Sequence, residues 1–363
     1  MLSKRISALL LLSAICLSSV YIVMRGGFFQ RRPAEEGVTL SQAADDFVGN
    51  NFPFGEQLKQ LATRFRLLSG QWEQNGVYIT DGHLLDNIQE KDPTIGDENI
   101  HAITSFVETN KVPSYLMLIP TSAAIHQEEK PMYAPLTNQR RYIEDVYRSM
   151  TGRVSTVDVY QTLLNHREEG IYYKTQSNLT GLGGYYVYSV LARRLGFEVN
   201  PLDWYEIQYS PGTYYGDLYQ RAPYKKVAPD LVSFFHFSKY RREYRVVHIY
   251  PNEVTTYYTL YPSHLLSGGQ PFDSFLGGIS PIVKITSTAP YDQRLLLFGD
   301  RTAASFLPFL CNRYREITVV NLSGTTPQMI ADLDIRQYDQ IVFTYSVDTF
   351  MNDPSITNVL DAK

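Results

Sequence analysis

An uncharged, apolar run near the N-terminus divides this 363-residue chain into two parts that cannot share one fold. The run extends from Ile6 to Met24 and follows a basic start at Lys4 and Arg5. As a helix it would measure about 28 Å, close to the hydrocarbon thickness of a bilayer. A soluble surface helix would carry a polar face, and this run has none. We therefore predict a membrane anchor over residues 1–24 that places a single-pass protein in the cell membrane, with its domain extracytoplasmic.

A cleaved signal peptide is the main alternative to this anchor. Cleavage requires small residues after the apolar core, and residues 23–27 read Val-Met-Arg-Gly-Gly, which is a poor site. Cys16 does not form a lipidation motif, because Ile15 occupies a position that requires a small residue. The sequence therefore favours an uncleaved signal anchor.

Charge and cysteine content restrict the ligands of the remaining chain. The formal net charge is −4, and residues 1–32 carry five basic and no acidic side chains, so removing them leaves −9. An acidic domain is not expected to bind nucleic acid. Cys311 is the one cysteine outside the apolar run, so no disulfide forms within the domain. The seven histidines are scattered, with no His-x-x-x-His or Cys-x-x-Cys spacing, and we expect no metal and no cofactor.

Apolar runs alternate with helical patterns along the domain, which is typical of an α/β layer structure. Continuous apolar strands such as 112–120 suit a parallel sheet covered on both faces. A stalk and leading helix (helical at 56–69) are assigned to 25–69, and the α/β domain to 70–363. The Asp81-Gly82 pair predicts a hairpin. Further strands are predicted at 153–160, 294–298, 316–322 and 340–345, and helices at 101–109, 139–150, 183–195 and 303–312.

Residues 200–270 interrupt this alternation and read as an inserted loop-and-hairpin region. Twelve tyrosines lie between Tyr205 and Tyr261. Aromatic faces stack on sugar rings, so a glycan groove is one interpretation of this insert. The alternative is that the tyrosines pack half-buried strands and keep their hydroxyls wet.

Three segments lie where strands turn into helices, or loops enter helices, and these are the places where a hydrolase-like site is built. They are residues 171–180 (IYYKTQSNLT), residues 275–279 (FLGGI) and residues 297–306 (LFGDRTAASF).

These segments resemble the DHHW family, relatives of the SGNH hydrolase-like proteins of envelope polysaccharide O-acetylation. That family reads Tyr-Tyr-x-Thr-Asp-His-His-Trp-Thr before a helix, then Phe-Leu-Gly-Gly-Asn, then Lys-Asp-Ser-Tyr-Ala-x-Ser-Phe. The resemblance covers most of residues 70–350. It implies an SGNH-like, three-layer α/β/α core with a mostly parallel sheet.

The active positions of the family are replaced in this chain. The family Asp falls on Gln176, its second His on Asn178 and its nucleophilic Ser on Arg301. Acyl transfer needs a base to take the proton of the nucleophile and a carboxylate to orient that base, and these three residues supply neither. The Trp and Asn positions hold Leu179 and Ile279. Thr175, Thr180, Gly277, Gly278, Asp300, Ala303, Ser305 and Phe306 match the family.

The resemblance and these losses together predict a catalytically inactive relative, a pseudoenzyme. It would bind an envelope polysaccharide (an exopolysaccharide) or a protein partner. The protein partner that the resemblance implies is a membrane-bound O-acyltransferase. Arg301 would hold a carboxylate of an acidic sugar, or else pair internally with Asp300 or another acid. The ligand-binding candidates are Arg301, Gln176, Asn178, Asp300, Gly277 and Gly278.

An active O-acetyltransferase or esterase with displaced residues is the alternative. Ser177, Thr302 and Ser305 are the hydroxyls nearest the lost positions. No histidine is close to them in sequence. We expect the nearest histidines to be surface or satisfied interior residues: His166, His236, His248 and His264.

Overall fold

The computed structural model describes residues 55–266 and 271–361, in which the chain forms two compact units, Met1–Gln71 and Trp72–Lys363. Helix α3 (Gly55–Leu68), predicted at 56–69, belongs to the first unit. The predicted anchor at 1–24 lies outside the described residues. Among the helices that the structure does describe, none is both long and apolar enough to span a bilayer.

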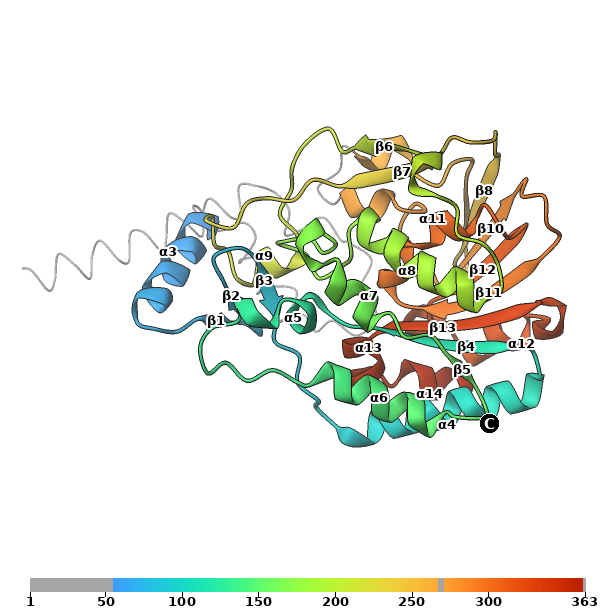
Figure 1. Cartoon of the computed structure of the whole chain (residues 1–363), viewed down its shortest axis with the longest axis horizontal. Coiled ribbons are helices and arrows are strands. Elements are labelled where there is room, and N and C mark those ends of the chain that lie inside the picture. The colour runs from blue at the N-terminus through green and yellow to red at the C-terminus, as the bar shows by residue number, and fades with distance from the viewer. Residues whose placement is uncertain (1–54, 267–270, 362–363) are drawn as a thin grey trace, which may run out of the picture. The chain divides into compact units, whose positions relative to one another are not determined.

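A mixed eight-stranded sheet forms the centre of the second unit, in the order β5-β4-β13-β11-β12-β10-β8-β9 (Figure 1). The first five strands are parallel, and the last three run antiparallel to their neighbours. The prediction of a mostly parallel sheet was therefore too simple. The strands are β4 (Ser114–Ile119), β5 (Ser155–Thr156), β8 (Tyr244–Ile249), β9 (Val254–Tyr257), β10 (Ile282–Ser287), β11 (Arg294–Gly299), β12 (Glu316–Val320) and β13 (Gln340–Ser346).

Two strands of the predicted insert belong to this main sheet. β8 and β9 form a hairpin, and β8 pairs with β10, a strand that the sequence patterns did not indicate. A separate two-stranded sheet does occur within 200–270, where β6 (Tyr205–Tyr209) pairs with β7 (Ser233–Phe237). The boundary at 270 therefore cuts through an antiparallel extension of the sheet.

Helices lie on both sides of the sheet, with α4, α6 and α14 on one side and α7, α8 and α11 on the other (Figure 1). Asp92 caps α4 at the Thr94 amide and Pro93 follows it, so α4 begins eight residues before the predicted 101–109. The predicted helix at 303–312 is split into two short helices, because Pro308 lies in the first turn of the second one. The elements are α4 (Pro93–Asn110), α6 (Gln139–Ser149), α7 (Tyr160–Asn165), α8 (Gly181–Arg194), η5 (Arg301–Ser305), α11 (Leu307–Leu310), α13 (Val347–Asn352) and α14 (Ser355–Leu360).

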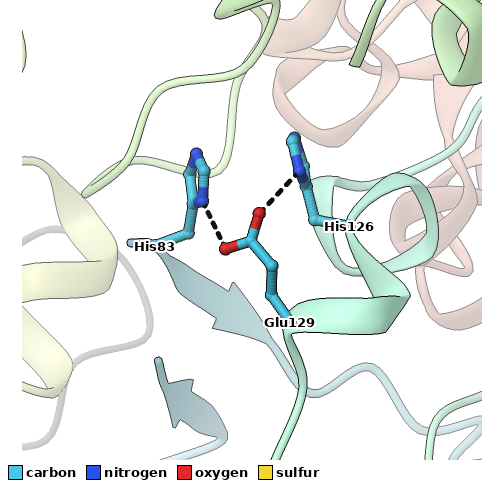
Figure 2. Close-up of side chains that lie close together, drawn as sticks. All are labelled: His83, His126 and Glu129. Carbon is cyan, nitrogen blue, oxygen red and sulfur yellow. Dashed lines mark hydrogen bonds and ion pairs between the residues drawn. The ribbon is translucent and has the colours of Figure 1, made fainter. Parts of the chain in front are cut away.

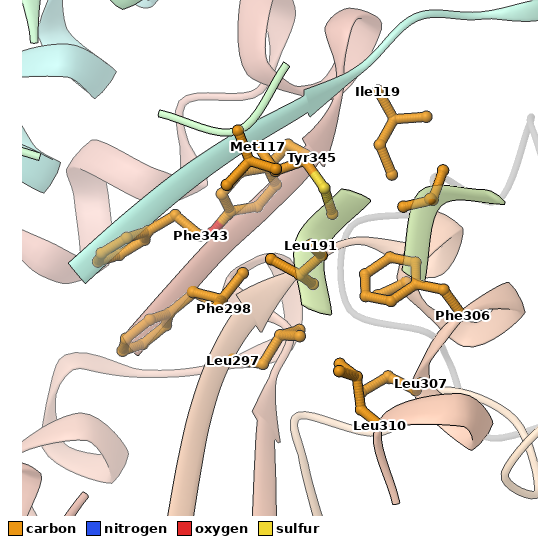
Figure 3. Packing of buried hydrophobic residues seen from close by; sticks show 14 of the residues in the cluster. Met117, Ile119, Leu191, Leu297, Phe298, Phe306, Leu307, Leu310, Phe343 and Tyr345 are labelled. Atoms are coloured by element: carbon orange, nitrogen blue, oxygen red, sulfur yellow. The ribbon is translucent and has the colours of Figure 1, made fainter. Parts of the chain in front are cut away.

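Apolar side chains of β4, β11 and β13 pack between these layers (Figure 3). The Phe298 and Phe343 rings stack at 5.0 Å, and Phe106 of α4 meets Phe298 edge-on at 5.3 Å. In β11, the five residues that follow Arg294 are all buried, as expected for a central parallel strand. This core holds the carboxyl end of β11, from which the third family segment extends into η5.

The Asp81-Gly82 hairpin prediction is confirmed. β2 (Val77–Ile79) pairs antiparallel with β3 (Leu84–Asp86), and β1 (Glu73–Gln74) completes a three-stranded sheet. The Leu84 amide donates to the Lys174 carbonyl over 2.8 Å, so the hairpin lies against the first family segment.

The tyrosines of 205–261 divide between interior and surface. Five of them are buried: Tyr205, Tyr214, Tyr219, Tyr224 and Tyr261. Four are exposed: Tyr209, Tyr240, Tyr250 and Tyr258. The buried group supports the packing interpretation of the tyrosine content.

Candidate functional site

The first family segment is a tight turn that leads into α8. Thr180 caps this helix by accepting from the Gly183 amide at 3.2 Å, and its hydroxyl donates to the Gly170 carbonyl at 2.9 Å. The Tyr173 amide donates to the Asn178 carbonyl across the turn at 3.3 Å. Backbone and threonine hydrogen bonds therefore fix this turn at the start of α8.

Thr175 and Asp230 fasten this turn to the region after α8. The Asp230 carboxylate accepts from the Lys174 amide at 2.7 Å, from the Thr175 amide at 2.8 Å and from the Thr175 hydroxyl. Burial raises the pKa of Asp230, and these hydrogen bonds oppose the rise. Thr175 also accepts from the Gly216 amide at 3.0 Å. The retained Thr175 therefore has a positioning role.

Gln176 and Asn178 lie inside the protein, with exposed fractions of 3% and 7%. The Gln176 amide oxygen accepts a hydrogen bond from the Tyr214 hydroxyl. Within the described residues the Asn178 side-chain amide has no hydrogen-bond partner. Between them, Ser177 donates its hydroxyl to Asp217 at 3.0 Å. Neither amide can act as a base, and the Ser177 hydroxyl faces a carboxylate without an intervening imidazole.

Arg301 follows β11 and begins η5, at the position of the family nucleophile. Its guanidinium forms an ion pair with Asp273 and lies 5.2 Å above the Phe272 ring. Phe272 and Asp273 belong to η4 (Pro271–Ser274). The expected internal pairing of Arg301 therefore exists, and its partner is Asp273 rather than Asp300.

An aromatic layer connects the Arg301 and Gln176 positions. Tyr173 meets Phe272 edge-on at 6.0 Å and Tyr214 at 6.1 Å. Burial strongly raises the pKa of Tyr214, whose hydroxyl donates to Gln176, whereas the positive charge of Arg301 opposes the rise. Arg301 and Gln176 are therefore connected through the rings of Phe272, Tyr173 and Tyr214.

The side chains of Asp300 and Ser305, which match the family, form hydrogen bonds to the backbone. Asp300 caps η5 by accepting from the Thr302 amide at 2.9 Å, and its second oxygen accepts from the Ser346 amide at 2.8 Å. It thereby joins the ends of β11 and β13. Ser305 is fully buried and donates its hydroxyl to the Thr302 carbonyl at 2.8 Å, so it is not presented as a nucleophile.

Gly277 and Gly278 have φ values of +87° and +97°, which side-chain-bearing residues rarely adopt. A Cβ at Gly277 would also lie 2.5 Å from the Tyr257 ring. These glycines shape the loop before Ile279, which is 41% exposed.

A pocket of about 180 Å³ opens beside Arg301, at the ends of β11, β12 and β13. Ile279, Asp300 and Tyr345 are among its lining residues. The Tyr345 hydroxyl is buried and lacks a hydrogen-bond partner within the described residues. Because ligand pockets for whole drug-sized molecules measure about 300–1,000 Å³, this volume suits one charged or polar substituent.

Of the four histidines considered from the sequence, His248 lies beside the second family segment, where its Nδ1 meets the Ser280 hydroxyl at 3.1 Å. Its two ring nitrogens thus face this hydroxyl and a backbone carbonyl, and no carboxylate of the described residues orients the ring. His166 bonds to Glu169 at 2.8 Å, and buried His248 bonds to the Leu276 carbonyl at 2.8 Å. His236 is half-buried and His264 is exposed. In the part of the chain that the structure describes, no hydroxyl of the family segments hydrogen-bonds to an imidazole.

The sequence did not indicate a second cluster, formed by His83, His126 and Glu129 (Figure 2). Glu129 Oε2 is hydrogen-bonded to His83 Nδ1 at 2.7 Å, and Glu129 Oε1 lies 3.0 Å from His126 Nδ1 in an ion-pair contact. Burial lowers the pKa of His126, and the neighbouring His83 lowers it further, while Glu129 opposes both effects. The i,i+3 spacing of His126 and Glu129 was the one available signal, because His83 lies more than 40 residues away in sequence.

Comparison with solved structures first defines the class of fold. The second unit resembles a DHHW family protein from Eubacterium siraeum, with a TM-score of 0.65 and 21% identity over 78% of this chain and 95% of that one. It also resembles PatB1 of Bacillus cereus, solved with a sulfonyl adduct, with a TM-score of 0.63 and 14% identity over 77% and 97% of the two chains. The O-acetyltransferase domain of Pseudomonas putida AlgJ matches with a TM-score of 0.48 and 14% identity over 79% and 99%. No curated protein matches the sequence.

The family itself is shown by the sequence. The family model described as DHHW protein matches residues 75–320, about two thirds of the chain. The chain belongs to the DHHW family, and its fold is the mixed α/β fold of these structures.

Proposed function

We propose that this chain is a non-catalytic DHHW-family protein of the cell envelope, which binds an acidic polysaccharide through the pocket beside Arg301. The observation that carries the proposal is the identity of the residues at the family's catalytic positions. Gln176 is bonded to Tyr214, and Arg301 is paired with Asp273. A hydroxyl cannot be activated where the base and its carboxylate are replaced by amides, and a guanidinium does not lose its proton.

The ligand class follows from the chemistry of the pocket. The Arg301 side chain is 38% exposed and its partner Asp273 is 41% exposed, so a carboxylate from solvent can compete for the guanidinium. Arginine binds carboxylates through a planar fork of donors. The unpartnered Tyr345 hydroxyl offers a further donor at the same pocket. A uronic acid substituent supplies the carboxylate and fits the pocket volume.

The apolar run Ile6–Met24 supports a place for this protein at the membrane. A single-pass anchor would hold the domain at the outer face of the cell membrane, where envelope polysaccharide passes. The family resemblance implies a membrane-bound O-acyltransferase as the protein partner. In this role the domain would present the glycan, and its partner would perform the acyl transfer.

A binding measurement tests the ligand class. Calorimetry with the detergent-solubilised full chain should detect a uronic-acid oligosaccharide and not its neutral counterpart. Arg301→Gln should weaken binding by about 10-fold or more, because a charge-assisted hydrogen bond is lost. Arg315→Gln is the matched control, since Arg315 is a more exposed arginine whose weak pair with Asp292 spans 3.7 Å. Equal affinity for both oligosaccharides, or an unaltered Arg301→Gln variant, would contradict the proposal.

A chemical test addresses the active alternative. The full chain is incubated with an activated acetyl ester and with a serine-directed covalent probe. We expect neither turnover nor labelling above buffer. Turnover or labelling that disappears in Ser177→Ala, Thr302→Ala or Ser305→Ala would show an enzyme that uses a displaced nucleophile.

A further inference from the structure

The loop before β3 and the segment after β4 bring two imidazoles to one carboxylate. His83 ends the hairpin turn, where Thr80 Oγ1 accepts from its amide at 2.9 Å. His126 follows α5 (Ser122–Ile125), and Glu129 lies in η1 (Gln127–Glu129). Gly82 admits the carboxylate, since a Cβ there would lie 3.2 Å from Glu129 Oε2. The three residues thus come from segments that precede and follow α4 along the chain.

The two rings stack at 4.5 Å with 26° between their planes, and both turn Nδ1 toward Glu129 (Figure 2). The second nitrogen of each ring points to the side away from Glu129 (Figure 2). Within the described residues, neither of these second nitrogens has a hydrogen-bond partner. His126 is only 5% exposed, and His83 and Glu129 are half-buried.

We propose that His83, His126 and Glu129 form a binding site for a divalent transition-metal ion of the zinc class. One ligand atom from each residue lies within 4.8 Å of the others. In a tetrahedral zinc site with bonds of about 2.0–2.1 Å, ligand atoms lie about 3.3 Å apart. The side chains therefore need only small movements, and no residue has to be brought from elsewhere.

The donor set selects the class of ion. Two imidazoles and one carboxylate suit zinc, copper or nickel, whereas calcium and magnesium prefer oxygen ligands. Three protein ligands leave one position open, as in sites that hold a water molecule. The Tyr172 ring meets His126 edge-on at 6.4 Å, and Tyr172 belongs to the first family segment. A bound ion would therefore stand beside the degenerate motif and link the hairpin to the end of β4.

A second His–Glu pair in this chain, His166 and Glu169, differs from the cluster in its number of imidazoles. His166 and Glu169 have the same i,i+3 spacing as His126 and Glu129, and His166 Nδ1 bonds to the carboxylate at 2.8 Å. Only one imidazole is present there, and the Tyr186 ring stacks on it at 3.7 Å. This pair is the natural matched control.

The test is zinc binding to the detergent-solubilised full chain, purified without a histidine tag and stripped with chelator. We expect calorimetry to give one equivalent of Zn²⁺, Mg²⁺ and Ca²⁺ to fail to compete, and Co²⁺ to give the absorption of a tetrahedral site. His83→Ala and Glu129→Gln should weaken Zn²⁺ binding by at least about 10-fold, and His166→Ala should leave it unchanged.

His83→Ala is the decisive variant because His83 lies on a partly exposed turn, whereas removal of the buried His126 side chain would also disturb packing. Circular dichroism checks that His83→Ala and Glu129→Gln are folded. Absence of stoichiometric uptake, binding by His83→Ala equal to that of the unaltered chain, or equal loss in His166→Ala would each overturn the proposal. Because the polysaccharide tests use Arg301 and no metal, the two proposals can fail separately.

Discussion

Single side chains at the positions of the family motifs form fixed contacts within the fold. Arg301 pairs with Asp273, Gln176 accepts from Tyr214, and Asp300 spends both oxygens on backbone amides. Gln176 and Arg301 offer neither a general base nor a nucleophile, and both can form hydrogen bonds to oxygen atoms, which is the basis of the binding function that we propose.

Buried His248 predicts a loss of stability in mild acid. Burial lowers its pKa, which its hydrogen bond to the Leu276 carbonyl opposes. In the unfolded chain a histidine has a pKa of about 6.5. Below that pH the unfolded state binds the proton first, so the free energy of unfolding falls as pH drops toward the lowered folded pKa.

Urea unfolding of the full chain at pH 7.5 and 5.5 measures this effect. His248→Gln should lose less stability between these pH values than the unaltered chain, by at most about 1.4 kcal/mol per pH unit for one proton. His101→Gln is the control, because the His101 side chain is 72% exposed. An identical pH dependence in all three proteins would remove His248 as the cause.

At the scale of elements, helix α8 is positioned by direct backbone approach to the loop that follows β11. A Cβ at Gly184 would overlap the Ser305 carbonyl oxygen, and a Cβ at Gly183 would overlap the Ile171 carbonyl oxygen. The helix therefore touches both the first and the third family segment through glycines. This contact sets the spacing between the Gln176 turn and Arg301.

Gly184→Ala should consequently destabilise the protein although alanine favours helices. Overpacking costs about 1–3 kcal/mol, and backbone atoms yield less than side chains, so the cost should exceed the gain of about 1 kcal/mol in helix propensity. We expect a net loss of up to about 2 kcal/mol in urea unfolding. Gly212→Ala should be neutral or slightly stabilising, because no atom lies within 4 Å of its added Cβ. Equal stability of the two variants would show that α8 can shift away.

At the scale of the whole molecule, we propose that the N-terminal apolar run holds the domain at the cell membrane. If residues 1–24 are an uncleaved anchor, the full chain should remain in the membrane pellet after alkaline carbonate washing. Deletion of residues 1–24 should release the expressed domain into the soluble fraction. Mass spectrometry of the membrane-extracted chain should find residues 1–24 present, and a mature chain that begins beyond Met24 would establish the cleaved alternative.

The sequence alone determined the family, the parallel strands and which residues occupy the motif positions. Local patterns suffice for these features, because β4, β11 and β13 are continuous apolar runs and the motif positions can be read one by one. Only the tertiary structure decided that β8 and β9 extend the main sheet, since strand pairing depends on partners far away in the chain.

The same reason explains what was missed at the sites. Asp273 as the partner of Arg301, and Tyr214 as the partner of Gln176, are 28 and 38 residues away. His83 meets Glu129 across 46 residues of intervening helix and strand. Spacing rules detect ligands only when they share one helix or turn. Clusters assembled from several elements become visible when the fold brings those elements together.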